Sequence, residues 1–519
     1  MHISGRKSRY YLLTFLKHDL KASITVFFVA LPLCLGISLA SGAPLYSGLI
    51  AGIIGGVVVS LISGSQLSVS GPAAGLTAIC ATAIIELGSM SVFVLAVAIA
   101  GLLQILAGLL KLGGFTSFIP SAVIKGMLAA IGVLLMSKQI PLVIGYDRPD
   151  FWTNEFFNLL TFKHGFEQIG DFYNRISPGA LVIAVFSFVL IYTWNRTLAK
   201  KFSYLPSSFI IVLAGSILAF IFDKFVPYLQ LNAEQYVSIP GNIFASINFP
   251  DFTSLFKNPA IWKNAIVICF VASLETLLSI EAIDKLDPYN RITPQNRELV
   301  AQGSGNLLSG LLGGIPITAV IVRSSANAEA GGKTKLSGFT HGIWLLLVVL
   351  LAVPVVNMIP YSVLAVILIR TGFNLAKPAM FKGVYKQGRE QFMPFIVTII
   401  AILFTDLLIG VLIGLAYSIY FLIKHTYRAG YTMRQEKEGG IENFYIDLAL
   451  NVSFLNKKKI GVLLDSVPPY SVVHINGGSS VYIDNDILEI IQDYKAKAHL
   501  KHIELKLTAI PEVQTIELH

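Results

Sequence analysis

Residues 313–325 read Gly-Gly-Ile-Pro-Ile-Thr-Ala-Val-Ile-Val-Arg-Ser-Ser, an apolar run that two glycines and a proline open. The run carries a single arginine, Arg323, which we expect about two helical turns in. A helix needs ~20 apolar residues to cross a bilayer, so this stretch predicts a half-helix that starts near the membrane centre. The free N–H groups of its first turn would then need a ligand, a cavity water or another protein group as a partner. Because the helix dipole and Arg323 both attract negative charge, the stretch predicts half of an anion site.

The first half of the chain contains a similar stretch. Residues 68–77 read Ser-Val-Ser-Gly-Pro-Ala-Ala-Gly-Leu-Thr, which again places Gly-Pro at the head of a short apolar segment. Either Gly-Pro alone would fit a kink in an ordinary helix. Two interrupted segments at matching places in two halves instead favour a transporter built of inverted repeats, with its substrate at the repeat interface.

The composition is that of a polytopic membrane protein. Hydrophobic residues make up 54% of the chain and charged residues 13%. The net charge is +9, but the basic residues lie mainly in short loops between apolar runs, so they indicate topology and not nucleic-acid binding. Their distribution predicts that both termini lie in the cytoplasm, and we expect a protein of the inner or plasma membrane.

The apolar runs predict about 14 transmembrane segments in two sets of seven. The first set covers about 22–41, 46–63, 72–87, 91–110, 121–138, 178–194 and 207–222. The second set covers about 263–280, 298–312, 316–329, 338–356, 361–376, 392–406 and 407–424. We expect a transmembrane domain over residues 1–430, with repeat one at about 20–222 and repeat two at about 262–425. Segments 139–177 and 223–262 are expected to be caps on the outer side.

After residue 430 the composition becomes polar. We expect a linker at 435–440 and a small cytoplasmic α/β domain over residues 436–519. Strands are predicted at 445–451, 471–475 and 502–507, with helices at 454–465 and 484–497. This tail contains no phosphate-binding motif or catalytic cluster, so a regulatory or assembly role is expected.

The motifs resemble those of one known family. Residues 296–306 read Asn-Arg-Glu-Leu-Val-Ala-Gln-Gly-Ser-Gly-Asn, and with 313–316 and Arg323 they closely resemble the SulP family of anion permeases. Residues 452–457 and 482–486 are similar to the cytoplasmic STAS domain of that family. The resemblance implies a fourteen-segment fold of two inverted seven-segment repeats, split into a core and a gate domain and forming a homodimer. It implies sulfate, bicarbonate, chloride or a dicarboxylate as the substrate.

The resemblance also implies the site, position by position. The substrate-binding positions are those at the starts of the third and tenth segments: Ala73, Ala74, Val320, Ile321, Val322 and Arg323. The acidic position of the eighth segment matches Glu275, and Ser279 follows one turn later. Sodium-using members carry Asp at the acidic position, followed by a hydroxyl residue. Leu33 departs from the plant and animal pattern, which has a polar residue there.

Arg323 and Glu275 are both ionisable residues within apolar segments, which makes each a functional candidate. As a purely structural ion pair, they would leave little net charge for an anion. A protonated Glu275 would leave Arg323 free, as a proton symporter requires. If the coupling ion is Na⁺ instead, Glu275 and Ser279 would supply oxygen ligands. No other metal and no cofactor is expected.

We therefore expect a secondary active transporter of sulfate or bicarbonate, coupled to H⁺ or Na⁺, with an elevator-like movement of core against gate. The alternative is an anion channel or a non-transporting, anion-sensing relative. A membrane enzyme with the tail as catalyst is disfavoured, because the tail lacks a catalytic cluster.

Overall fold

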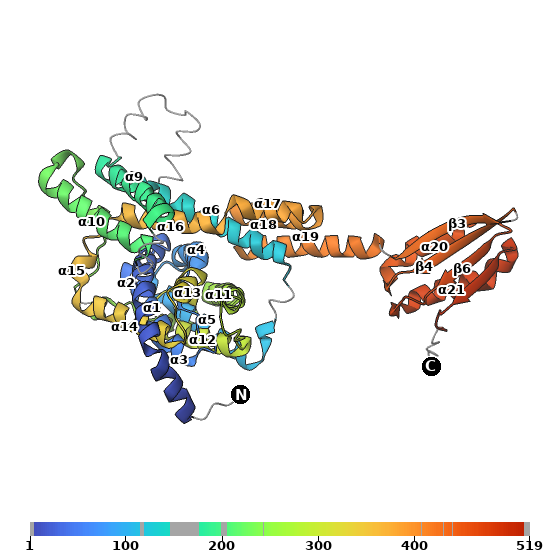
Figure 1. Cartoon of the computed structure of the whole chain (residues 1–519), viewed down its shortest axis with the longest axis horizontal. Helices are drawn as coiled ribbons and strands as arrows, with labels where there is room; N and C mark the ends of the chain where they lie inside the picture. The colour runs from blue at the N-terminus through green and yellow to red at the C-terminus, as the bar shows by residue number, and fades with distance from the viewer. Residues whose placement is uncertain are drawn as a thin grey trace, which may run out of the picture. The chain divides into compact units, whose positions relative to one another are not determined.

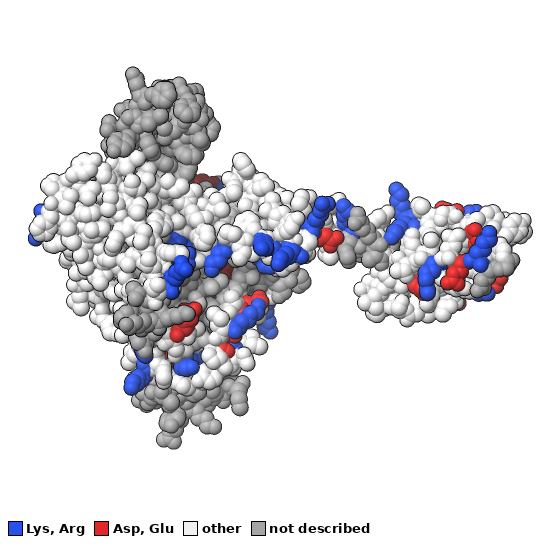
Figure 2. All heavy atoms as spheres, turned by 45° about the horizontal axis from the view of Figure 1, so that its top comes forward, with Lys and Arg blue, Asp and Glu red and all other residues white. Residues whose placement is uncertain are grey.

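The computed structural model describes residues 5–114, 119–145, 176–198, 205–241, 243–405, 407–428, 430–438 and 440–512. By its internal contacts the chain divides into two compact units. The first comprises Met1–Gly388 with Phe395–Leu412, and the second comprises Arg389–Pro394 with Ile413–His519. Nine helices within the described residues are long and apolar enough to cross a membrane. Most atoms on the visible face of the helical unit belong to uncharged residues, as suits a surface that faces lipid (Figure 2).

The helices of the first half follow the predicted runs closely. They are α1 (Gly5–Ala40), α2 (Leu45–Ile54), α3 (Ser60–Ile62), α4 (Thr77–Leu87), α5 (Met90–Leu109), α6 (Ser121–Ile144), α9 (Pro178–Thr193) and α10 (Ser207–Phe225). A π-helical turn, η1 (Gly55–Val59), joins α2 to α3 into one span, and η5 (Trp194–Leu198) extends α9. The third predicted segment is interrupted: strand β1 (Ser70–Pro72) and the 3-10 turn η2 (Ala74–Leu76) precede α4.

The second half has the same order of elements. Its helices are α11 (Ala260–Asp284), α12 (Gln295–Leu311), α13 (Ile321–Glu329), α14 (Leu336–Leu351), α15 (Val353–Val356), α16 (Tyr361–Leu375), α17 (Pro378–Lys386), α18 (Arg389–Phe404) and α19 (Leu407–Arg428). Strand β2 (Ile317–Ala319) precedes α13 as β1 precedes α4. The short helix α17 lies in a basic stretch between the segments predicted at 361–376 and 392–406.

Helix packing is reciprocal between the two halves. Helix α1, the first segment of repeat one, packs against α14, the fourth segment of repeat two. Helix α11, the first segment of repeat two, packs in the same way against α5, the fourth segment of repeat one. The fifth segments α6 and α16 pack against each other. This reciprocity is the arrangement that two inverted repeats produce.

The helices form two groups (Figure 1). Helices α1, α2, α4, α5 and α11–α14 surround the strand pair, whereas α6, α9, α10 and α16 pack with one another beside them. Of the two expected caps, 139–177 lies largely outside the described residues. The other, 223–262, contains the short 3-10 turns η6 (Pro227–Leu229), η7 (Ala233–Gln235), η8 (Phe244–Ser246) and η9 (Phe252–Ser254).

The C-terminal part is an α/β domain, as predicted. Its four-stranded sheet has the order β3-β4-β6-β8, with β3 (Tyr431–Glu438) antiparallel to β4 (Ile441–Leu448). Strands β6 (Val472–Asn476) and β8 (Glu504–Thr508) run parallel to β4, and β5 (Asn451–Val452) pairs with β7 (Tyr482–Ile483). The 3-10 turn η10 (Phe454–Asn456) leads into α20 (Lys457–Asp465), and η11 (Ala498–Lys501) follows α21 (Asn485–Lys497). The two helices and the sheet share one apolar core.

One prediction for this domain was wrong. The expected linker at 435–440 is instead the end of strand β3 and its turn, so the expected domain start at residue 436 falls inside a strand. The reason is that β3 is an edge strand whose residues Thr432 to Lys437 are exposed. Since neither face is buried, no apolar alternation marks the strand in the sequence.

Candidate functional site

The two interrupted segments meet as a small antiparallel sheet. Strand β1 pairs with β2 in a register that sets Ser70 opposite Ala319 and Pro72 opposite Ile317. All six strand residues are buried. The pairing continues as the N–H of Val320 donates to the carbonyl of Val69 at 3.0 Å. The short strand of each repeat therefore has its backbone hydrogen-bonded to the short strand of the other repeat.

This geometry corrects the prediction of a half-helix that starts at residue 316. Residues 317–319 are extended, and α13 begins only at Ile321, which puts Arg323 in its first turn and not about two turns in. The physical reason is that Pro316 has no N–H, while the β-branched Ile317 and Thr318 favour an extended chain once a partner strand is available. The N-terminal ends of both helices still lie at the strand pair, as predicted.

Side chains complete the open edges of the two strands. The amide of Asn306, on α12, donates to the carbonyl of Ile317 at 3.0 Å and accepts from the N–H of the same residue. Gln302 donates to Ser70 at 2.7 Å, and the hydroxyl of Thr276 accepts from the N–H of Ala319 at 3.3 Å. Sequence reasoning missed these roles, although Gln302 and Asn306 belong to the motif that carries the family resemblance. Polar residues four apart on an apolar helix were the available signal.

A cavity of about 60 Å³ lies at the junction of strands and helices. Six of the eight predicted site residues line it: Ala74, Glu275, Ser279, Val320, Ile321 and Val322. The other lining residues are Leu33 and Ile37 on α1, Leu128 on α6, Leu278 on α11, and Thr371 and Leu375 on α16. A space of this size has room for a small anion or a few waters. Sequence reasoning missed the contributions of α6 and α16, because nothing local places those helices opposite the half-helices.

Ala73 and Arg323 do not line this cavity. Ala73 is the buried residue that precedes η2. Arg323 is fully buried against β1, where its Nη2 donates to the carbonyl of Pro72 at 3.3 Å and to Cys34 Sγ at 3.4 Å. Its Nε and Nη1 have no hydrogen-bond partner among the described residues. An ideal Cβ at Gly71 would lie 3.0 Å from the guanidinium carbon, so only glycine leaves space for this side chain.

Glu275, on α11, lies where strand β1 leads into the first half-helix. The N–H of Gly75, in the 3-10 turn that opens the first half-helix, hydrogen-bonds its carboxylate. The second oxygen, Oε2, has no partner among the described residues. An ideal Cβ at Gly75 would lie 2.6 Å from Oε2, so the carboxylate rests directly on the glycine. In the part of the chain that the structure describes, Glu275 and Arg323 form no ion pair, and the purely structural pairing of the two is not what this structure has.

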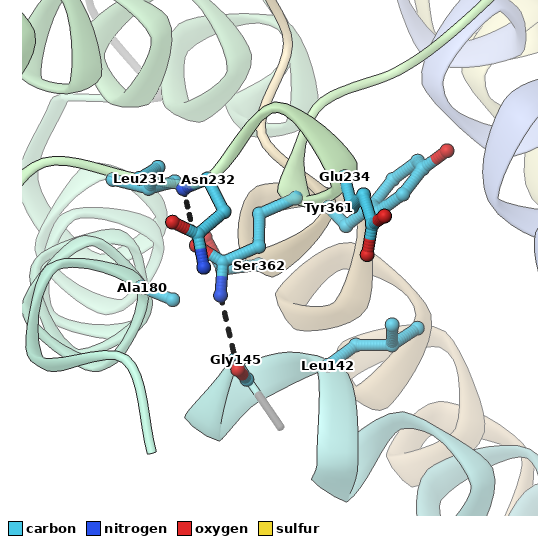
Figure 3. Close-up of a pocket in the computed structure, with 9 residues that line it drawn as sticks. Leu142, Gly145, Ala180, Leu231, Asn232, Glu234, Tyr361 and Ser362 are labelled. Atoms are coloured by element: carbon cyan, nitrogen blue, oxygen red, sulfur yellow. Dashed lines mark hydrogen bonds between the residues drawn. The ribbon is translucent and has the colours of Figure 1, made fainter. Parts of the chain in front are cut away.

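A second polar cavity, of about 100 Å³, contains none of the predicted site residues. It lies where α6, α9 and α16 meet residues 231–235 (Figure 3). Gln235 donates to the carbonyl of Gly145 at 3.0 Å and accepts from the N–H of Asn232 at 3.1 Å. Dashed lines mark these hydrogen bonds at Gly145 and Asn232 (Figure 3). The hydroxyl of Ser362 also lines this cavity and has no hydrogen-bond partner among the described residues. The cavity at the half-helices is the better candidate site because it combines the N-terminal ends of two helices with a buried carboxylate.

The chain is similar in sequence to several known proteins. The model of the sulfate permease family matches residues 16–401. YvdB of Bacillus subtilis, assigned to sulfate transport, is 30% identical over 437 residues, which are 84% of this chain and 79% of that protein. The bicarbonate transporter BicA of Picosynechococcus is 25% identical over 414 residues, which are 77% of this chain and 69% of that protein.

Two solved structures share the fold. The transmembrane domain of a cyanobacterial BicA superposes with a TM-score of 0.62 at 25% identity, covering 78% of this chain and 97% of that one. The murine anion transporter Slc26a9, in an inward-facing state, gives a TM-score of 0.73 at 13% identity and covers 98% of this chain and 89% of that one. The second likeness shows that the fold extends over nearly the whole chain, the α/β tail included. Family model, relatives and fold lead to the same assignment, and the chain is a member of the sulfate permease family.

Proposed function

We propose that this membrane protein is a secondary active transporter of a small inorganic oxyanion, sulfate or bicarbonate, and that a proton taken up by Glu275 drives it. The observation that carries the proposal is the cavity between the two half-helices, which combines two helix N-termini with a buried carboxylate. The names of the relatives support both anions, because YvdB is assigned to sulfate and BicA to bicarbonate.

Anion binding would rest on backbone groups and on one buried charge. The lining side chains Ala74, Val320 and Ile321 offer no donors, so the N–H groups of the first helical turns would hold the anion. Arg323 would attract it from behind strand β1, where low polarity strengthens a charge interaction. Such a site selects for charge and only weakly for shape. This suits a family whose members carry different oxyanions.

Coupling would arise from competition between two negative groups. The ionised carboxylate of Glu275 already occupies the N–H of Gly75, which is one of the donors an anion would need. Protonation removes the charge and frees that donor, so proton and anion would bind together. We favour H⁺ over Na⁺ because only Glu275, Ser279 and Thr371 bring oxygen side chains to the cavity, fewer than the six that a well-coordinated hard cation takes.

Transport would follow from movement between the two helix groups. Most of the lining belongs to the group around the strand pair, whereas Leu128, Thr371 and Leu375 belong to α6 and α16. Sliding one group past the other would carry the cavity away from these three residues, which is the elevator-like movement we propose. We further propose a homodimer in the inner or plasma membrane with both termini in the cytoplasm. The short basic loops of the sequence support that orientation.

The test is uptake of labelled sulfate or bicarbonate into proteoliposomes with an imposed proton or sodium gradient. Glu275→Gln imitates the protonated state, so exchange of internal for external anion should persist while gradient-driven accumulation disappears. Glu281→Gln is the matched control, because Glu281 lies on the same helix and pairs with Lys285 at an exposed position. Accumulation at the native rate in Glu275→Gln would refute the coupling role. Non-saturable flux without accumulation in the native protein would instead favour the channel alternative.

A further inference from the structure

A second candidate site lies outside the anion cavity, on a face of the helical unit that apolar residues form. An apolar groove of about 350 Å³ runs between α1, α10 and α15. We define this lipid groove by Phe28, Pro32, Phe209, Leu213, Ile217 and Val356. Phe28 and Phe209 stack with ring centroids 3.8 Å apart. All but one of the residues that line the groove are apolar, and the exception is Ser216.

A polar cavity, also of about 350 Å³, adjoins the lipid groove. The two spaces share the lining residues Ser216, Phe220 and Met358, so they adjoin at these three side chains. We call the polar part the head cavity, and its polar side chains are Asp223, Tyr236, Ser238 and Asn357. The hydroxyl of Ser216, at the junction, has no hydrogen-bond partner among the described residues. A single molecule that is apolar at one end and polar at the other would match both spaces.

Asp223 is the charged residue that lines the head cavity, and Lys224 lies beside the lining without belonging to it. Asp223 lines the cavity and accepts a hydrogen bond from the hydroxyl of Tyr236 at 2.8 Å. Lys224 follows it in sequence, and its Nζ lies 4.7 Å from the centroid of the Phe220 ring, which belongs to both spaces. A carboxylate beside aromatic rings suits an ammonium group, and a lysine suits a phosphate. The pair therefore complements a zwitterionic head that carries one group of each kind.

The length of the groove fits one lipid chain. Phe209 and Phe220, both in the groove, are eleven residues apart on α10. At ~1.5 Å per helical residue they are separated by about 16 Å along the helix axis. One leaflet contributes about half of the ~30 Å hydrocarbon core, which is nearly the same length. The head cavity lies at the C-terminal end of α10, where a lipid head at the membrane surface would be.

We infer that this groove binds one phospholipid with an amine-bearing zwitterionic head, its acyl chain in the lipid groove and its head in the head cavity. The ammonium group contacts Asp223, the phosphate contacts Lys224, and the hydroxyl of Ser216 donates to an ester oxygen. The site joins α1, from the group around the strand pair, to α10, from the other group. Pro32 lines the groove and its neighbour Leu33 lines the anion cavity, so the lipid and the anion lie against the same stretch of α1.

Native mass spectrometry of the purified full-length protein tests the inference, with phosphatidylethanolamine and phosphatidylglycerol of matched chains as probes. We expect one phosphatidylethanolamine to remain bound per chain, with an affinity about tenfold above that for phosphatidylglycerol. Leu213→Trp fills the groove and should lower that affinity about tenfold. Val189→Trp is the matched control, because Val189 is 58% exposed and Leu213 50%, but Val189 does not line the groove. If Leu213→Trp does not fold, Ile217→Trp makes the same test.

The head is tested separately. Asp223→Asn should abolish the preference for phosphatidylethanolamine while both lipids still bind through their chains. Asp493→Asn, an exposed change in the α/β domain, should leave the preference unchanged. Equal binding of the two lipids by the native protein would overturn the head assignment. Native affinity in a folded Leu213→Trp or Ile217→Trp variant would overturn the site itself.

Discussion

Gly75→Ala should separate coupling from anion binding. In the structure the N–H of Gly75 holds the carboxylate of Glu275, and an ideal Cβ at residue 75 would lie 2.6 Å from Oε2 and 2.8 Å from the carboxyl carbon. Ordinary contacts of a Cβ begin at 3.4 Å, so the carboxylate must move by about 0.8 Å. The backbone at this position has a negative φ that alanine also adopts, so the strain falls on the Glu275 side chain.

The size of the effect follows from the hydrogen bond that the displacement weakens. A hydrogen bond to a charged group contributes about 1.5–3 kcal/mol, and each 1.4 kcal/mol corresponds to about a tenfold change in an equilibrium constant. We therefore expect the gradient-driven accumulation of the labelled anion to fall about ten- to hundredfold. Counterflow exchange, which needs no net proton movement, should change much less.

Proteoliposome uptake and exchange, measured on the same preparations, provide the assay. Gly383→Ala is the matched control, since no atom lies within 4 Å of an ideal Cβ there. A double-mutant cycle with Glu275→Ala, measured on anion binding because accumulation is already lost without the carboxylate, identifies the route of the effect: Gly75→Ala should do nothing further once the carboxylate is gone. Equal losses in the presence and absence of the Glu275 carboxylate would refute the proposed contact as the cause.

Three further predictions concern other parts of the chain. Arg323→Ala should weaken anion binding by about 2–5 kcal/mol in a folded protein, and unchanged affinity by isothermal titration would remove Arg323 from the site. Truncation after Arg428 should leave anion binding within about twofold of native, because the α/β domain has its own core; loss of binding in a well-folded truncation would contradict the regulatory role. Burial alone would raise the pKa of Asp287, but its hydrogen bonds with Arg291, at 2.6 and 3.0 Å, and with backbone N–H groups lower the pKa overall. The stabilisation from Asp287 is therefore complete above the ordinary Asp pKa of about 3.9 and is lost as the pH falls through the lower folded value. Asp287→Asn should lower the free energy of unfolding by about 1–3 kcal/mol at pH 7, measured by thermal unfolding, and should not change it at a pH below the folded-state pKa of Asp287. An equal loss of stability at pH 7 and at that low pH would disprove this account.

Local patterns predicted most of the helical architecture. Hydropathy alone located segments such as α5 and α10 to within a few residues, because a membrane requires long apolar helices. Gly-Pro and the lone Arg323 marked the two interrupted segments, since each is unfavourable in an ordinary span. Six of the eight predicted site residues line one cavity, although the role given to them stays a prediction.

What the sequence did not reveal depends on distant contacts. Three residues of β1 form a strand only because three residues of β2 pair with them. The conformational preferences of the residues themselves do not predict so short a pair of strands. The role of Asn306 as a substitute partner for Ile317 depends in the same way on how α12 lies beside β2. The edge strand β3 was not predicted because its residues 432–437 are exposed, so no apolar alternation marks the strand. In each case the local structure depends on a contact with a distant part of the chain or with solvent.

The pairing of β1 with β2 also constrains how this protein is made. The two strands are about 250 residues apart in the chain, and synthesis at ~5–20 residues per second separates their appearance by about 12–50 s. During that interval the backbone of β1 lacks the partner that satisfies it, and each unpaired polar group left in lipid costs several kcal/mol. Until β2 is synthesised, the backbone of β1 must therefore be hydrogen-bonded to water or to another protein. A stop in translation before β2 should leave a nascent chain that depends on the insertion machinery or its chaperones.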